Sequence, residues 1–245
     1  MASNYKKLEE AYEQLGWLKQ RPDDYSKEEI IALVKHVQTL IQETIVDHTP
    51  KPKGKFDLWE YVANDELRPV LNGIYHDPIN KVAAATDAHV LVVDRASFDE
   101  NLVDKEKGDE MWKGKRPVDK YGKFIDGRFP SYEKVFPENI DEYEKFVIDI
   151  DEIASLVTQH KAWCKLNGYA RYRHAPTCIY RIKDTYFEIH LLHSFLKATG
   201  GQISVISPDK AGVYFSDERK ALIMPILYEP KRIKEIDGML LQDVY

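Results

Sequence analysis

The chain has 245 residues, 43% of them hydrophobic, with only 12 Gly and 12 Pro. This length and composition are typical of a folded protein with a sizeable core, and they exclude a disordered or collagen-like chain. The formal net charge of −6 argues against a protein that coats nucleic acid indiscriminately.

The sequence carries no signal for a membrane or for an oxidising compartment. No apolar run approaches the roughly 20 residues of a membrane-spanning helix, and the start, MASNYKK, lacks the apolar core of a signal peptide. Cys164 and Cys178 are the only cysteines and form no Cys-x-x-Cys pair, so a disulfide framework is not expected. We therefore predict a soluble cytoplasmic protein without membrane contact.

Residues 1–50 are predicted to form a helical N-terminal extension. Residues 5–18 have an amphipathic pattern, and Ser26 with Glu29 three residues later forms a capping-box pattern for a second helix. Apolar residues recur at helical spacing along it: Ile30, Leu33, Val34, Val37, Leu40 and Ile41. The Pro and Gly residues of 48–54 indicate a linker. The extension is expected to dock on the body, to mediate oligomers or to bind a partner.

From residue 56 onward the pattern changes to mixed strands and helices. In chain order we predict strands at 73–76 and 81–85 around a turn, a strand at 89–93, a long charged loop at 97–123, a strand at 146–149, a helix at 150–165, strands at 177–183 and 186–189, a helix at 190–199, and strands at 203–206, 211–215 and 221–226. Gly200 and Gly201 form a common left-handed helix stop. The order and types of these elements predict an α+β protein.

Charge is unevenly distributed along the chain. Residues 153–183 contain no Asp or Glu but hold six cations: Lys161, Lys165, Arg171, Arg173, Arg181 and Lys183. Acidic residues gather instead in 94–110 and 138–152. A basic surface on an acidic body suits a protein with one face toward phosphate, and a solvated charged face is the alternative.

Four separated segments carry a resemblance that none of them carries alone. They are LRPVLNGI at 67–74, ATDAHVLV at 85–92, DGRFPSYEKVFP at 126–137 and ALIMPI at 221–226. Together, and in this order, they resemble the bacterial sliding clamp, the beta subunit of DNA polymerase III. The resemblance implies a DNA-clamp-like fold of repeated strand-helix-strand-strand-strand half-units.

The implied organisation has four parts. Residues 1–50 are the helical extension, 56–140 match part of the clamp second domain and its linker, 141–228 form the C-terminal clamp-like domain, and 229–245 form a tail. The first clamp domain and the second half of the next have no counterpart in the chain. The apolar cluster of 238–245 resembles a pocket ligand, and a strand or helix packing elsewhere is the alternative.

In the sliding-clamp family the four segments build a pocket for peptide tails of polymerases and other DNA enzymes. By the resemblance, the pocket residues here are Leu71, Thr86, Ala88, His89, Val90, Leu91, Pro130, Lys134, Val135, Gly212, Leu222, Met224, Pro225, Ile226 and Leu227. Ala88 replaces a family glycine, and Val90 and Leu227 replace family arginines. A more purely hydrophobic peptide preference follows from these replacements, although each residue alone is more often part of a core.

Clamps hold DNA through Lys and Arg on helices, without reading bases, and such contacts weaken with salt. The candidate contacts here are Lys161, Lys165, Arg171 and Arg173. Interleaved aromatics could stack on single-stranded bases or be half-buried structural residues: Trp163, Tyr169 and Tyr172.

The sequence favours a homo-oligomeric, sliding-clamp-like replication processivity factor that binds DNA and partner peptides. The alternative is a clamp-derived peptide-binding adaptor or decoy that does not encircle DNA. We expect no enzyme, because nucleotide-binding and nucleophile motifs are absent. No cofactor or metal is expected, since His190 and His193 have no partner motif that would complete a zinc site.

Overall fold

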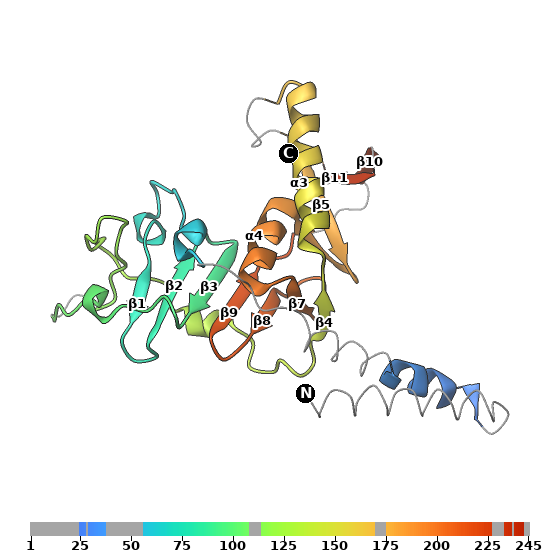
Figure 1. Cartoon of the computed structure of the whole chain (residues 1–245), viewed down its shortest axis with the longest axis horizontal. Coiled ribbons are helices and arrows are strands. Elements are labelled where there is room, and N and C mark those ends of the chain that lie inside the picture. The colour runs from blue at the N-terminus through green and yellow to red at the C-terminus, as the bar shows by residue number, and fades with distance from the viewer. Residues whose placement is uncertain are drawn as a thin grey trace.

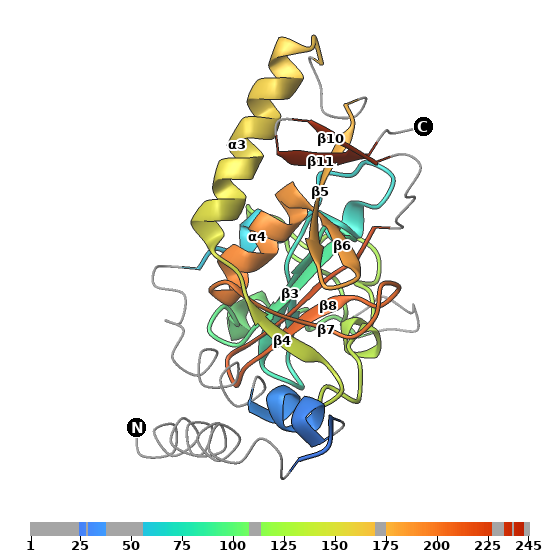
Figure 2. The same ribbon diagram turned by 90° about the vertical axis from the view of Figure 1, so that its right-hand side faces the viewer.

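The computed structural model describes residues 25–27, 29–37, 56–107, 114–169, 175–226, 233–236 and 238–242. Two antiparallel sheets and two helices form the body (Figure 1, Figure 2). The predicted α+β class is therefore confirmed. The predicted helix at 5–18 and the predicted linker at 48–54 lie outside the described residues.

The larger sheet has seven strands in an order that mixes the two ends of the chain. From edge to edge they are β1 (Tyr75–Asp77), β2 (Val82–Thr86), β3 (Val90–Asp94), β9 (Arg219–Ile223), β8 (Gly212–Phe215), β7 (Gln202–Val205) and β4 (Glu144–Val147). β3 pairs with β9, so that Leu91 lies opposite Leu222. The regions 56–140 and 141–228 therefore share one continuous sheet, which Figure 1 shows running across the molecule.

The smaller sheet contains the described part of the C-terminal tail. Its order is β10 (Ile233–Ile236), β11 (Met239–Gln242), β5 (Thr177–Ile182) and β6 (Thr185–Glu188). β10 and β11 form a hairpin, and β11 pairs with β5. β11 of the tail is thus a strand packed in this sheet. The structure therefore agrees with packing of the tail as a strand and not with its interpretation as a pocket ligand.

The two helices, α3 (Ile150–Leu166) and α4 (Ile189–Thr199), have identifiable caps. The Asp149 side chain accepts a hydrogen bond from the Asp151 amide, and the Glu188 side chain accepts one from the Leu191 amide. α4 ends at Gly200 in the left-handed conformation, with φ of 66°, so the predicted helix stop is confirmed. α4 packs against α3 and against strands of both sheets.

Short 3-10 helices and one capped N-terminal helix complete the described structure. The 3-10 segments are η2 (Leu58–Tyr61), η3 (Pro69–Leu71), η4 (Glu100–Leu102) and η5 (Tyr132–Val135). Residues 27 and 29–37 are helical. The Ser26 amide donates to the Glu29 carboxylate at 2.8 Å and the Glu29 amide to Ser26 Oγ at 3.3 Å, which confirms the capping box.

The topology relates the two helices and the two sheets by a repeating pattern. The strand before each helix pairs with the strand after the other helix: β4 pairs with β7, and β6 pairs with β5. After α4, β8 and β9 extend the larger sheet directly. On the α3 side, the hairpin of β11 and β10, from the far end of the chain, takes the corresponding two places beside β5.

Alternating residues send the side chains of the larger sheet to opposite faces. On the face toward α4, Val90 and Ile223 join a large cluster with Phe187 and Phe195. On the opposite face, Leu91 and Leu222 form a second cluster, packed against the chain segment 129–136. A third cluster lies between α3 and the smaller sheet. The predicted site residues Leu91 and Leu222 therefore face away from α4, whereas Val90 faces toward it.

Candidate functional site

The four segments that carry the resemblance meet around the pairing of β3 with β9. Leu91 and Leu222, from the second and fourth segments, are cross-strand partners. They share a buried cluster with Phe129 and Tyr132 of the third segment. The first segment ends in Ile74, which belongs to the cluster on the other face of the same strands. Residues up to about 150 positions apart are thereby brought together around the two central strands of the larger sheet.

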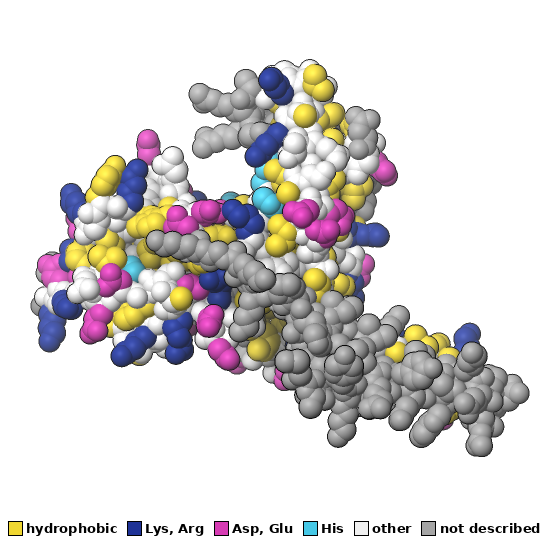
Figure 3. Space-filling model, viewed as in Figure 1, with side chains coloured by type: hydrophobic (Ala, Val, Ile, Leu, Met, Phe, Trp, Pro, Cys, Tyr) yellow, Lys and Arg dark blue, Asp and Glu magenta, His cyan; other side chains and the backbone are white. Residues whose placement is uncertain are grey.

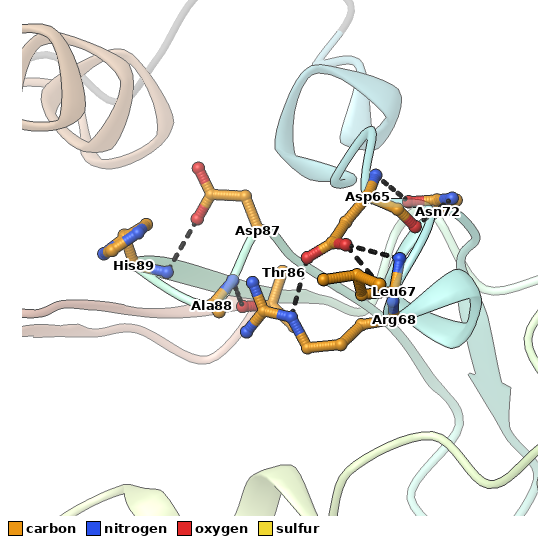
Figure 4. Close-up of polar contacts among 8 residues, drawn as sticks. All are labelled: Asp65, Leu67, Arg68, Asn72, Thr86, Asp87, Ala88 and His89. Carbon is orange, nitrogen blue, oxygen red and sulfur yellow. Dashed lines mark hydrogen bonds and ion pairs between the residues drawn. The ribbon is translucent and has the colours of Figure 1, made fainter. Parts of the chain in front are cut away.

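The turn between β2 and β3 is fixed by its own polar side chains (Figure 4). Thr86 Oγ1 donates to the Val90 carbonyl at 2.7 Å and accepts from the Ala88 amide at 3.0 Å. One Asp87 oxygen accepts from the amides of both His89 and Val90, at 2.8 and 2.7 Å. These bonds hold Ala88 and His89 exposed at the end of the strand pair.

Ala88 has a φ of 77°, a conformation that L side chains adopt reluctantly. We expect Ala88→Gly to raise the free energy of unfolding by about 0.5–1 kcal/mol, because relief of strain exceeds the added freedom of the unfolded chain. Chemical denaturation measures the change. Ala96→Gly is the matched control, since Ala96 is also exposed but is not among the residues with positive φ. A loss of stability at both positions would contradict the expectation.

The segment 129–135 is attached to the sheet by buried contacts. Tyr132 donates its hydroxyl hydrogen to Asp77 Oδ2 at 2.8 Å, and Asn80 donates to both side chains. Burial raises the pKa of Asp77, but these donated hydrogen bonds outweigh burial and hold that pKa below its usual value. The Phe129 ring stacks on the Tyr75 ring, with 5.4 Å between the two ring centres. This attachment leaves Pro130, Lys134 and Val135 exposed.

Three supporting residues were not among the predicted site residues: Asp77, Phe129 and Tyr132. Phe129 and Tyr132 lie inside the third segment, and their spacing of three residues was the available signal. Asp77 was predicted only as a turn residue. Its side chain accepts from the amides of Ile79 and Asn80, so it shapes the turn and holds Tyr132 at once.

The chain that follows β9 extends the site beyond the sheet. The Met224 amide donates to the His89 carbonyl at 2.8 Å, and the Ile226 amide donates to the Tyr186 carbonyl at 2.9 Å. The Met224 side chain is 48% exposed, while Pro225 and Ile226 are half-buried. Leu227 lies outside the described residues. A flexible thioether is therefore presented beside the turn of Ala88 and His89.

The remaining predicted pocket residues do not all lie on one face. Leu91 and Leu222 lie on the face that carries residues 129–136. Val90 is in the core on the α4 side, and a side chain at Gly212 would approach Ile203, Phe187 and Ile223 of that core within about 3 Å. Val90 and Gly212 therefore lie on the α4 side of the sheet, opposite the face that carries Leu91 and Leu222.

Leu71 is buried at the end of η3. The loop before η3 is held by its own polar contacts, which Figure 4 shows among Asp65, Arg68 and Asn72. The Asp65 amide donates to the Asn72 side chain at 2.9 Å, and Asn72 Nδ2 donates back to the Asp65 carbonyl at 3.0 Å. Arg68 pairs with the Asp65 carboxylate at 2.7 Å. Because of these bonds, Leu67 at the loop tip is held almost fully exposed.

Two of the four candidate DNA contacts are described. Lys161 and Lys165 are exposed on α3, one helical turn apart, whereas Arg171 and Arg173 lie outside the described residues. The Trp163 ring stacks with the rings of Tyr169 and His160, with 5.7 and 6.4 Å between ring centres. The indole therefore contributes to internal packing. Figure 3 shows cationic side chains, in dark blue, on the protruding α3, whose sequence contains lysines and no arginine.

Neither a metal centre nor a membrane span is evident in the described part of the chain. Its His, Cys, Asp and Glu side chains form no group of three placed to hold a metal ion. Its helices include none that is long and apolar enough to cross a bilayer. His190 instead contacts His160, with 3.1 Å between Nε2 of the former and Nδ1 of the latter.

Comparison with known proteins finds similarity only among solved structures. No protein-family model and no curated protein matches the chain. A Caulobacter crescentus beta sliding clamp is 16% identical, with a TM-score of 0.47, over 69% of this chain and 61% of that one. A second structure, Caulobacter crescentus pol III beta, is 14% identical, with a TM-score of 0.48, over 76% and 65%.

A Helicobacter pylori beta clamp bound to a DNA ligase peptide is 13% identical, with a TM-score of 0.43, over 70% of this chain and 61% of that one. This chain therefore spans less than two thirds of the length of these clamps.

Proposed function

We propose that this chain is a sliding-clamp-like replication processivity factor. It acts as a homo-oligomer, holds DNA through backbone contacts without reading sequence, and binds peptide segments of polymerases or other DNA enzymes. The chain itself carries out no catalysis. Its role is to keep partners on DNA.

The observation that carries this proposal is the convergence of the four segments. Sequence alone gave only their order along the chain, and that order does not require them to touch. Pairing of Leu91 with Leu222, packed against Tyr132, supports one common surface for the second, third and fourth segments. A set of chance matches would have no reason to gather around the same two strands of one sheet.

The proposed pocket has a buried apolar base and an exposed apolar rim. Leu91 and Leu222 form the base, and Met224 and Val135, which are 48% and 54% exposed, form the rim. Large apolar anchors of a peptide gain affinity by leaving water at such a place, and an adaptable methionine suits several partners.

The other predicted pocket residues have supporting roles in this proposal. Thr86, Ala88, His89 and Leu71 shape one wall, while Pro130, Lys134, Pro225 and Ile226 complete the other. Val90 and Gly212 contribute from the α4 side of the sheet. The absence of a side chain at Gly212 lets Phe187 pack against β8, and Val90 anchors in the core the strand that carries Leu91.

We expect Met224→Lys to weaken the binding of an apolar-anchored peptide at least tenfold, because a charge replaces an apolar contact at the rim. The residue is half exposed, so folding should be unaffected. Fluorescence anisotropy with labelled peptides bearing one or two Leu or Phe anchors measures the affinity. Ile79→Lys is the matched control, because Ile79 is an exposed apolar residue (88%) on the turn between β1 and β2.

Equal affinities of the Met224→Lys and Ile79→Lys proteins would overturn the pocket assignment. Equal losses in both would mean that peptides adhere to any exposed apolar side chain. Only a selective loss at Met224 supports a defined site.

One observation favours the adaptor or decoy as the second candidate. In the described part of residues 95–143, no α-helix or strand of two or more residues follows β3. The described part of the first unit therefore contributes three strands and no covering α-helix. A protomer with fewer helices and strands in its first unit has less structure from which a closed ring could be built. Such an adaptor has no DNA association, so the DNA measurement described below distinguishes it from a clamp.

A further inference from the structure

A basic ridge runs along the contact between α3 and α4. On α3, Lys161 and Lys165 are exposed, and neither forms an ion pair with any carboxylate among the described residues. On α4, His190, His193 and Lys197 follow one another at helical spacing along the face that is not buried. Figure 3 shows histidine side chains beside Lys or Arg at this place.

His190 is kept neutral by burial and by its neighbours, and its ring donates a hydrogen bond to His160. His160 Nε2 lies 3.0 Å from the Pro176 carbonyl, which can only accept, so that nitrogen carries the hydrogen. His160 Nδ1 then accepts from His190 Nε2 at 3.1 Å. Burial, and then the neighbours His160 and Lys161, lower the pKa of His190 to about 4.

His193 is more accessible and stands among cations from two helices. Burial lowers its pKa, Lys197 of α4 and Lys161 of α3 lower it further, and Glu60 of η2 raises it by less. Lys197 pairs with Glu60 at 2.6 Å, so this carboxylate is already engaged. His193 is therefore uncharged near neutral pH, although it lies in a ridge that attracts anions.

Building on the DNA contact proposed above, we propose that the α3–α4 ridge binds phosphates of duplex DNA with uptake of a proton at His193. A phosphate beside Lys161 adds a negative charge near the imidazole and offsets the repulsion that keeps it neutral. The protonated ring then supplies a further positive charge to the same phosphate row. Duplex DNA fits this ridge because Lys161 and Lys165, one helical turn apart on α3, offer adjacent cations to successive phosphates of a strand.

The sign of the pH effect follows from linkage. The pKa of His193 is higher when phosphate is bound than when the ridge is free, so binding takes up protons. Affinity must therefore rise as the pH falls through the interval between those two values. The effect is lost above this interval, where the ring is neutral in both states.

The experiment measures the affinity of the full chain for a fluorescein-labelled duplex by anisotropy, at low salt, between pH 7.5 and 6.0. We expect affinity to increase about fivefold over this range. His193→Gln should abolish the increase while retaining binding at pH 7.5, and Lys161→Gln should weaken binding at every pH. His36→Gln, at an exposed histidine of the N-terminal helix, is the matched control and should retain the increase.

The outcomes separate this inference from the proposed function. If DNA binds without pH dependence, or if His193→Gln retains the dependence, the role of His193 is overturned and the DNA contact stands. If no DNA binds at any pH, both the ridge and the processivity role are overturned, and the adaptor alternative remains. Circular dichroism of each variant at both pH values verifies that the fold is intact.

Discussion

Replacing Arg219 by methionine is expected to lower the free energy of unfolding by about 3–5 kcal/mol. Arg219 Nε pairs with Asp94 Oδ1 at 2.8 Å, and the two side chains are only 14% and 1% exposed. Removal of the guanidinium leaves Asp94 as a buried carboxylate that keeps the hydrogen bond from Ser97 Oγ, at 2.6 Å, but has lost its charged partner. An uncompensated charge in that position is strongly destabilising.

Arg219 also joins three parts of the fold, which is why the effect should be large. Asp94 and Arg219 are opposite residues of β3 and β9, the pair of strands that connects the two regions of the larger sheet. Arg219 Nη1 donates to the Ala198 carbonyl near the end of α4 at 2.7 Å, and its guanidinium lies 3.5 Å from the centre of the Phe56 ring. The change therefore weakens the junction that positions the proposed pocket.

Lys183→Met is the matched control for Arg219→Met. Lys183 pairs with Glu144 at 2.8 Å, but both side chains are about half exposed (47% and 53%). Its loss should lower stability by about 1 kcal/mol or less, because exposed pairs are screened by water. Denaturant unfolding of the two variants measures both changes. Similar, small losses in both would show that the Asp94–Arg219 pair does not hold the sheet together.

Local patterns predicted the elements well because their causes are local. The capping box at Ser26 and the stop at Gly200 depend on residues a few positions away, and both are present in the structure. Short apolar runs beside a turn likewise predicted β2 and β3 to within about one residue at each end. Such signals need no knowledge of where the strand will pair.

Pairing partners far apart in the chain were beyond these patterns. Nothing near Leu91 indicates that Leu222 is its neighbour, and only the resemblance to a family suggested that the two segments meet. The interaction of Asp77 with Tyr132 was missed for the same reason: an acid in a turn and an aromatic in a loop carry no mark of each other. The strain at Ala88 became visible only with the backbone angles.

The C-terminal hairpin shows how one short segment supports two interpretations. Residues 238–245 contain a cluster of apolar residues, which would serve equally as a peptide ligand or as a strand. In the structure, Met239 and Leu241 are buried against Val157, Cys178 and Ile189, while Leu240 on the other face is only half-buried. This alternation is the period of a strand in a sheet, and it makes the two interpretations separable by single substitutions.

Leu241→Ala is accordingly expected to lower the free energy of unfolding by about 2–5 kcal/mol, because it empties a buried site beneath α3. Leu240→Ala, the same change one residue earlier, should lower it by about 1 kcal/mol or less. Denaturant unfolding measures both values, and anisotropy with the anchored peptides provides the second readout. A detachable ligand predicts the reverse: unchanged stability and tighter peptide binding in a tail variant. Because the hairpin fills the two places beside β5 that β8 and β9 fill beside β7, the tail should behave as part of the fold.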